Sequence, residues 1–98
     1  MVDYVQKKIG LSDEQTARYG DLYEQHHDSL RLLSEENRHA HQALFRYLQA
    51  PGTSDSVIEA AAEKIGATQT AIELSNFRHF RRVRALCTQE QLPRFDSL

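Results

Sequence analysis

The stretch Ala50-Pro51-Gly52-Thr53 interrupts an otherwise continuous helical pattern and divides the chain into two arms. Apolar residues recur at spacings of three and four along both arms, whereas the strict alternation typical of strands does not persist. A proline followed by a glycine indicates a turn, because proline fixes its backbone and lacks an amide donor. The sequence therefore predicts an all-α fold in which two long helices form an antiparallel hairpin.

Residues that lie equally far from this break face each other in such a hairpin. The matched apolar pairs are Leu48 with Val57, Leu44 with Ala61, Leu33 with Ile72, Leu22 with Val83, and Tyr19 with Leu86. His26 and His79 lie at matching distances as well. We therefore expect the two imidazoles to meet inside the helix seam.

The N-terminal arm begins with two helix boundaries. A short helix is predicted over residues 3–9, and Gly10 provides its left-handed cap. Ser12 and Gln15 have the spacing of a capping box, in which each side chain accepts a hydrogen bond from the backbone amide of the other. The helix that this box opens is predicted to continue for roughly 38 residues, until Pro51 ends it.

The C-terminal arm shows the same kind of boundary. Residues 53–56 offer several N-caps for a helix that is predicted to reach Cys87. Thr88 and Gln91 form a second capping box and open a short final helix that contains Pro93. A hairpin with a single seam buries little apolar surface, so we expect one domain over residues 1–98 that pairs into an intertwined homodimer.

Composition narrows the function classes. The net charge of −2 gives no general attraction to nucleic acid, and the one cysteine excludes an internal disulfide. No apolar stretch is long enough to cross a membrane, and the N-terminus lacks the apolar core of a secretory signal. We expect a soluble fragment of a membrane-anchored or secreted protein. Nucleophile elbows and phosphate loops are absent from the sequence, so an enzyme and a small-molecule substrate are not expected.

The paired histidines are the candidate metal site. Two neutral imidazoles that face each other across a seam can share a transition-metal ion such as Ni, Co, Zn or Cu. Glu24 and His27 lie within one turn of His26 and could complete the ligand set with His79. The alternative is that both histidines are satisfied core residues that hold no metal.

Charged and aromatic residues allow further interpretations. The acidic set on the first arm is expected to neutralise the arginines of the second arm across the hairpin; these residues are Asp13, Glu14, Asp21, Glu24 and Asp28 facing Arg78, Arg81, Arg82 and Arg84. Glu36 and His39 have the spacing of a di-iron motif, but no second copy exists, and a solvated surface is expected. The aromatic residues Phe45, Tyr47, Phe77 and Phe80 are expected to form either a dimer core or a binding surface.

Two short motifs carry a family resemblance: Leu11-Ser12-Asp13-Glu14-Gln15 and Cys87-Thr88-Gln89-Glu90-Gln91. They resemble the Leu-Thr-x-x-Gln signature of the bacterial periplasmic heavy-metal sensors and stress chaperones, which are helical hairpins that pair into dimers. The tail Gln91-Leu92-Pro93-Arg94-Phe95-Asp96 is similar to the end of the cobalt and nickel resistance sensors in that family. The resemblance extends from Leu11 to Leu98.

This resemblance implies a metal ligand at His79. Val83 stands where those sensors have a methionine ligand, Tyr23 stands near their glutamate, and residues 2–9 contain no histidine. If a metal binds, His26 with Glu24 or His27 would replace the missing ligands.

The resemblance also implies a function. The leading expectation is a periplasmic metal sensor that signals to a membrane-bound regulatory protein. The alternative is a periplasmic stress chaperone or adaptor that binds polypeptides without a metal. In that alternative, exposed aromatic side chains and the arginine-rich segment would form the binding surface.

Overall fold

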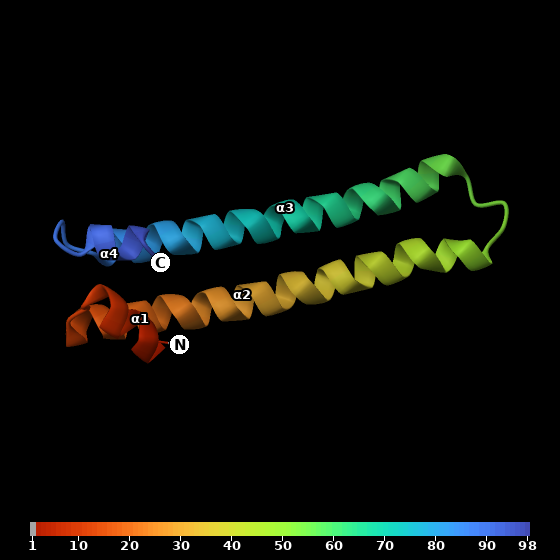
Figure 1. Cartoon of the computed structure of the whole chain (residues 1–98). Coiled ribbons are helices and arrows are strands. Elements are labelled where there is room, and N and C mark those ends of the chain that lie inside the picture. Colours follow the sequence, from red (N-terminus) through yellow and green to blue (C-terminus); the bar gives the residue numbers. More distant parts are fainter. Residues whose placement is uncertain (1) are drawn as a thin grey trace. The chain divides into compact units, whose positions relative to one another are not determined.

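The computed structural model describes residues 2–98, with side chains from Asp3 onward, and its regular secondary structure is entirely helical. The elements in chain order are α1 (Val2–Ile9), α2 (Asp13–Arg46), the 3-10 turn η1 (Tyr47–Gln49), α3 (Asp55–Leu86) and α4 (Leu92–Asp96) (Figure 1). No strand occurs within residues 2–98, which confirms the predicted all-α class. The short terminal helices are confirmed as well.

The break between the long helices is a compact turn. The α-helix ends at Arg46, before the predicted boundary, because residues 47–49 tighten into η1. Gly52 has a φ of +96°, a conformation that L side chains rarely adopt. The Thr53 hydroxyl donates to the Ala50 carbonyl at 2.7 Å, and the Ser54 hydroxyl accepts from the amide of Val57 at 3.4 Å, which caps the start of α3.

The chain divides into two compact units, each of which contains part of α2 and part of α3. The first, which we call the capped unit, consists of residues 1–28 and 76–98 and includes α1 and α4. The second, which we call the hairpin unit, is Ser29–Ser75 and consists of the turn and the helical segments beside it. That the chain behaves as one domain over residues 1–98 stays a prediction.

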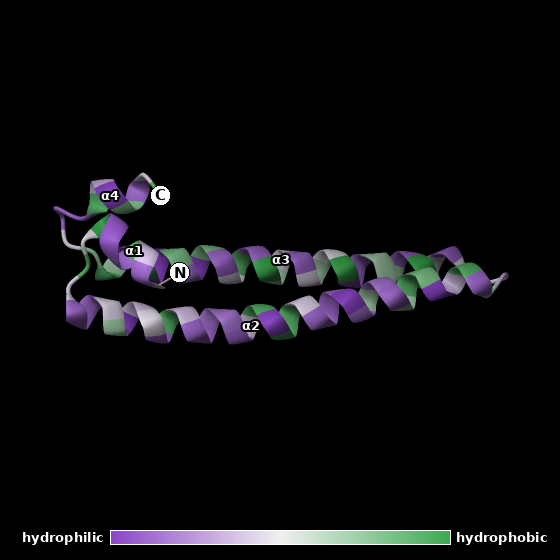
Figure 2. Cartoon of the chain, turned by 60° about the horizontal axis from the view of Figure 1, so that its bottom comes forward, coloured by the Kyte–Doolittle hydropathy of each residue, from purple (hydrophilic) through white to green (hydrophobic). Residues whose placement is uncertain are grey.

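The capped unit holds the apolar core. Its buried members are Val5, Ile9, Leu11, Tyr19 and Val83, with Leu22, Tyr23, Leu86, Cys87 and Phe95 packed against them. Ile9 and Val83 are fully buried, and each contributes about 1.5–3 kcal/mol relative to an exposed side chain. The helices α1 and α4 contact each other within this unit, as Figure 2 shows. The apolar pairs predicted nearest the chain ends therefore belong to one core.

The hairpin unit has fewer buried apolar side chains than the capped unit. Only Ala40 and Thr68 are buried within residues 29–75. In Figure 2 the apolar patches along α2 and α3 are repeatedly broken by polar ones. The large side chains of Leu32, Phe45 and Leu48 stay exposed. The helical hairpin is thus confirmed, but its seam in this unit is thin.

Candidate functional site

His26 and His79 meet in the capped unit, as the sequence predicts. Their ring centroids lie 4.0 Å apart, and the ring planes differ by 4°, so the imidazoles are stacked face to face. His79 is buried, with 4% of its surface exposed, and the edge of the Phe80 ring packs against it at a centroid distance of 5.1 Å. The two imidazoles therefore pack as flat rings inside the seam.

Each ring has a distinct polar environment. His26 Nε2 lies 2.8 Å from Asn76 Oδ1, and since a carbonyl oxygen only accepts, the imidazole nitrogen donates. Burial lowers the pKa of His79 below its usual value, and the neighbouring His26 and Arg82 lower it further. Each of these effects favours the neutral form of His79 over the charged one. Asn76 lies one turn before His79 on α3, which brings its side chain to the pair.

Glu24 and His27 lie in a different place from the histidine stack. Together with Tyr23 and Asp28 they line a shallow hollow of about 240 Å³ on the surface of α2. The His27 ring stacks on Tyr23 at a centroid distance of 6.3 Å, and its Nδ1 is 4.0 Å from an Asp28 carboxylate oxygen. The four predicted ligands thus separate into a stacked pair, of which His79 is buried and His26 half-buried, and an exposed pair.

The stacked pair does not fit a metal ion in this arrangement. An imidazole nitrogen coordinates through a lone pair in its own ring plane, at about 2.0–2.1 Å for zinc. Because the two planes are nearly parallel, the lone pairs of His26 and His79 do not converge on one point. Among residues 3–98, no three His, Cys, Asp or Glu side chains are close enough to hold an ion together. Metal binding would require the rings to turn and a further ligand to arrive.

The two sequence motifs form one hydrogen-bond network in the capped unit. Gln15 Nε2 donates to Gln91 Oε1 at 2.9 Å, and Gln91 Nε2 donates to Gln15 Oε1 at 3.1 Å, so the two amides pair reciprocally. Each amide oxygen also accepts from its own capping box, Gln15 from the Ser12 amide and Gln91 from the Thr88 amide, both at 2.9 Å. The predicted first box is complete, because the Gln15 amide also donates to the Ser12 hydroxyl.

The same two side chains also donate hydrogen bonds to backbone carbonyls at the C-terminal ends of α1 and α3. Gln15 Nε2 donates to the carbonyl of Leu86, the last residue of α3, at 2.8 Å. Gln91 Nε2 donates to the carbonyl of Gly10, which follows α1, at 2.8 Å. Helix ends leave unpaired backbone groups, and here one pair of glutamines serves the start of α2 and the ends of α1 and α3. The second predicted box is only half formed, because the Gln91 amide donates to the Thr88 backbone carbonyl and α4 begins at Leu92. Sequence reasoning also missed the pairing of the two glutamines, although Gln15 and Gln91 lie at nearly matching distances from the break.

The predicted charge neutralisation across the hairpin is wrong. Arg84 instead forms a two-pronged ion pair with Asp96 of α4, at 2.9 and 3.0 Å, which also lowers the pKa of the Asp96 carboxyl. Within the part of the chain that the structure describes, Arg78, Arg81 and Arg82 have no carboxylate within 4.0 Å. Their positions on α3 flank the buried His79 and Val83 and leave these guanidinium groups exposed to solvent.

Cys87 is half-buried against the core. Its thiol lies 3.7 Å from the Val83 carbonyl, and burial raises its pKa above the usual value. A raised pKa disfavours the thiolate, which is the form that attacks electrophiles and binds metals.

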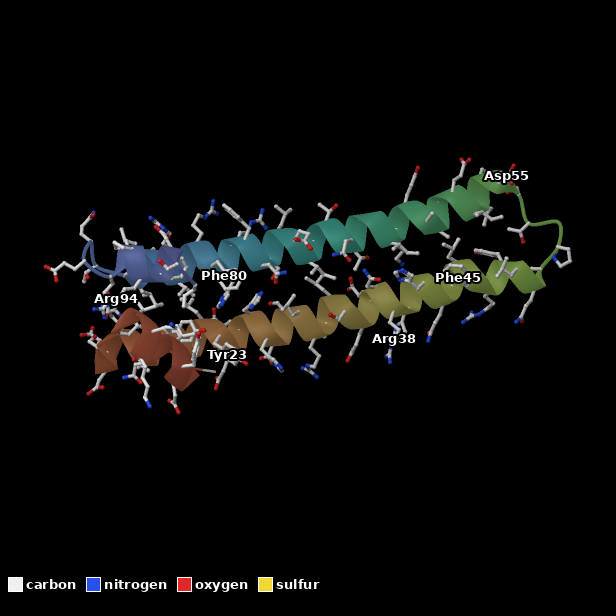
Figure 3. The ribbon with its side chains drawn as sticks, viewed as in Figure 1. Tyr23, Arg38, Phe45, Asp55, Phe80 and Arg94 are labelled. Atoms are coloured by element: carbon white, nitrogen blue, oxygen red, sulfur yellow. The ribbon has the colours of Figure 1, made fainter. Side chains whose placement is uncertain are left out.

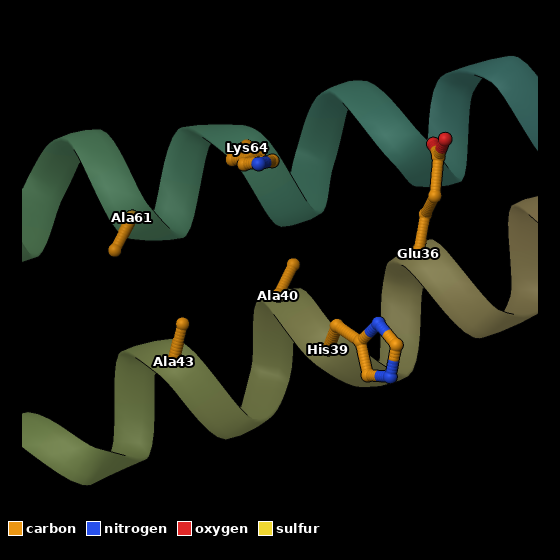
Figure 4. Close-up of a pocket in the computed structure, with 6 residues that line it drawn as sticks. All are labelled: Glu36, His39, Ala40, Ala43, Ala61 and Lys64. Carbon is orange, nitrogen blue, oxygen red and sulfur yellow. The ribbon is translucent and has the colours of Figure 1, made fainter.

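Glu36 and His39 border the hollow shown in Figure 4. This hollow of about 440 Å³ lies in the hairpin unit, where Ala40, Ala43 and Ala61 point into the space between α2 and α3 and Lys64 also lines it. Glu36 and His39 are themselves exposed, in agreement with a solvated surface. Small alanine side chains, rather than a converging ligand set, create this space.

Comparison of the chain with protein-family models, curated proteins and solved structures finds no match in any of the three. Among the described helices, none combines the length and apolarity needed to span a bilayer. The family resemblance therefore rests on the two motifs and the tail, and the function it implies is a proposal.

Proposed function

We propose that this chain is a polypeptide-binding module, similar in role to a periplasmic stress chaperone or adaptor, which needs no bound metal. The observation that supports this function is the exposure of bulky apolar side chains in both units. In the capped unit Phe77 is 63% and Phe80 55% exposed, and in the hairpin unit Phe45 is 58% and Leu48 80% exposed. Figure 3 marks Phe80 on α3 and Phe45 on α2.

Exposed aromatic side chains are costly in water and are enriched where proteins bind each other. Isolated exposed apolar residues are normal, but these aromatics occur in a chain whose buried core is small. On α3 the Arg81 guanidinium lies over the Phe77 ring, 5.4 Å from its centroid, so an apolar and a cationic group are presented together. Such a surface suits segments of unfolded or regulatory proteins that carry both apolar and acidic residues.

A homodimer is part of this proposal. The hairpin unit buries only Ala40 and Thr68, and a second copy packed on it would cover side chains such as Phe45 and Leu48. Sedimentation of the wild type and of Phe45→Ser tests this point. We expect a dimer whose dissociation constant rises in the variant, and a monomeric wild type would remove the dimer from the proposal.

The test of polypeptide binding is suppression of aggregation. A chemically denatured client protein is diluted into buffer with a chelator, and light scattering is followed with and without the wild-type chain. We expect suppression that is weakened by Phe77→Ser and retained by Val57→Ser, which changes an exposed apolar residue in the first turn of α3. Absence of suppression by the wild type would count against the proposed function.

Metal sensing is the second candidate, and the juxtaposition of His26 and His79 favours it. In that function the stacked rings would turn toward an ion and recruit an exposed ligand such as Glu24 or His27. Calorimetric titration of chelator-stripped protein with Ni, Co, Zn and Cu tests it, beside His26→Ala and His79→Ala. Stoichiometric binding lost in both variants would establish the site and displace the first proposal.

Location and signalling partner follow from the resemblance. We propose a periplasmic location and a membrane-bound regulatory protein as one partner. Fractionation of cells that produce the native protein, followed by crosslinking in membranes, tests both.

A further inference from the structure

The helix α3 carries a regular row of exposed residues on the side that faces away from the core. These residues, which we call the outer stripe, recur at alternating spacings of four and three: Glu63, Ala67, Thr70, Leu74, Phe77 and Arg81. All six are exposed, whereas Thr68, His79 and Val83 on the opposite side of the same helix are buried. Spacings of four and three keep one stripe of a helix against a partner helix over several turns, as in a coiled coil. The outer stripe therefore has the periodicity of a helix-pairing surface.

Charge is distributed unevenly along α3. Residues 55–63 contain three acidic residues and no basic one, whereas residues 78–86 contain four arginines and no acidic one. On the outer stripe this asymmetry places Glu63 near the start and Arg81 near the end. Within residues 3–98, neither side chain has an oppositely charged group within 4.0 Å. The Arg81 guanidinium instead lies over the Phe77 ring, 5.4 Å from its centroid, which places both side chains on the same face of the helix.

A second copy of α3 that runs antiparallel to the first has the matching pattern. About a two-fold axis at the middle of the outer stripe, Glu63 of each copy faces Arg81 of the other, so that one surface forms two ion pairs with itself. In the same register each large apolar side chain meets a smaller one: Phe77 faces Ala67, and Leu74 faces Thr70. A parallel in-register pair would instead place Glu63 against Glu63 and Arg81 against Arg81. The charges of the stripe therefore select a second copy in the antiparallel direction.

We propose that the outer stripe of α3 is an antiparallel pairing surface for a second copy of this chain. This assignment rests on the proposed function, adds α3 to the interface of its homodimer, and gives that dimer a regulatory role. Pairing covers Phe77 and Arg81, which also belong to the surface proposed to bind unfolded polypeptides. The second copy and a client therefore compete for the same face of α3.

The test is sedimentation equilibrium of the full chain with charge-reversal variants. Glu63→Arg and Arg81→Glu each replace both ion pairs of the dimer by contacts between like charges. We expect each variant to raise the dissociation constant of the dimer by about five- to thirtyfold. In an equimolar mixture of the two variants, both contacts across the interface again join opposite charges. The mixture should therefore dimerise with nearly the wild-type dissociation constant, a rescue that a loss of folding in either variant could not produce.

Matched controls reverse exposed charges elsewhere on the chain. Arg31→Glu and Glu35→Arg lie on α2, outside the outer stripe, and should change the dissociation constant by less than about twofold, alone or mixed. Leu74→Ser removes an apolar contact of the stripe and leaves both of its charges in place. It should weaken the dimer, and mixing it with either charge variant should restore nothing. Circular dichroism of each variant checks that the helix content is kept.

A second measurement separates pairing from client binding. Glu63→Arg weakens pairing but leaves Phe77 and Arg81 unchanged, so at equal chain concentration it should suppress the aggregation of a denatured client at least as well as the wild type. Arg81→Glu removes a group of the client surface and should suppress aggregation less. Loss of suppression in Glu63→Arg would overturn the competition between a second copy and a client.

The outcomes distinguish this proposal from the function on which it rests. A monomeric wild type would overturn the pairing surface even if the chain suppresses aggregation. A dimer that charge reversal does not weaken, or that mixing does not restore, would overturn it as well. Rescue by mixing in a chain that suppresses no aggregation would keep the pairing surface and remove the client function.

Discussion

Removing the paired amides of Gln15 and Gln91 should destabilise the chain by more than any exposed glutamine should. The Gln91 side chain takes part in four hydrogen bonds, to Gly10, Thr88 and twice to Gln15. Two of these bonds are partly buried and two are exposed. At about 0.5–1 kcal/mol each, Gln91→Ala lowers the free energy of unfolding by about 2–4 kcal/mol. For a chain of this size that is roughly 10–25 °C in Tm.

The pairing itself is tested by a double-mutant cycle. Gln15→Ala, Gln91→Ala and the double variant are unfolded in urea, and the free energies are compared. The two amide-to-amide bonds are lost in either single variant, so the double variant should be less destabilised than the sum by about 1–2 kcal/mol. Gln89→Ala, an exposed residue of the same loop, should change stability by less than about 0.5 kcal/mol.

Additivity within about 0.5 kcal/mol would refute the reasoning, because it would mean that the two boxes cap their helices independently. The isosteric Gln91→Glu adds a second check. It keeps the oxygen that accepts from Thr88 but loses the donor to Gly10, so it should be destabilising above the ordinary carboxyl pKa even though the box is retained.

Three further predictions concern single positions. The pKa of His79 is lowered in the folded chain, so the unfolded chain binds the His79 proton more tightly. The free energy of unfolding measured in urea should therefore fall as the pH drops below about 6.5. His79→Gln should flatten this dependence on pH, and an unchanged slope would contradict the lowered pKa of His79. Gly66 lies in a helix with open space around it, so Gly66→Ala should raise the stability measured in thermal melts by about 0.5–1 kcal/mol. Gly10 has a φ of +79°, so Gly10→Ala should lower stability by about 1–2 kcal/mol. Equal effects of the two substitutions would argue against a left-handed cap at Gly10. Val83→Ala should lower the free energy of unfolding by about 2 kcal/mol, because apolar burial is lost and a cavity forms. The exposed Val57 should tolerate Val57→Ala with little effect. Similar losses at both positions would contradict the placement of Val83 in the core.

Local signals in the sequence were sufficient for the helices. Gly10, Ser12 and the Pro51-Gly52 turn act through their own backbones, so their effect can be read without knowing the fold. The meeting of His26 and His79 could also be predicted, since residues equally far from a hairpin turn face each other. The distance of each residue from the turn specifies which residues of the two helices lie opposite each other.

The geometry of those meetings could not be predicted. Whether two imidazoles stack or converge depends on side-chain rotamers and on neighbours such as Asn76 and Phe80, which periodicity does not encode. The predicted ion pairs between α2 carboxylates and α3 arginines did not form, for a related reason. The carboxylate of Asp96 reaches Arg84 because the chain turns back after α3, so the predicted acidic partners on α2 were not the nearest ones.

The closure of Gln15 against Gln91 also constrains the order in which the chain folds. These residues are separated by 76 positions, whereas the turn at Gly52 joins near neighbours, so the turn carries a much smaller loop-closure entropy. We expect the hairpin to form first from the turn outward and the amide pair to close late, so that Gln91→Ala accelerates unfolding more than it slows refolding. During synthesis the end of α1 must wait for Gln91 to emerge before its carbonyl at Gly10 has this partner. Until then, the apolar faces of Val5 and Ile9 are available to whatever chaperone or neighbouring chain meets them first.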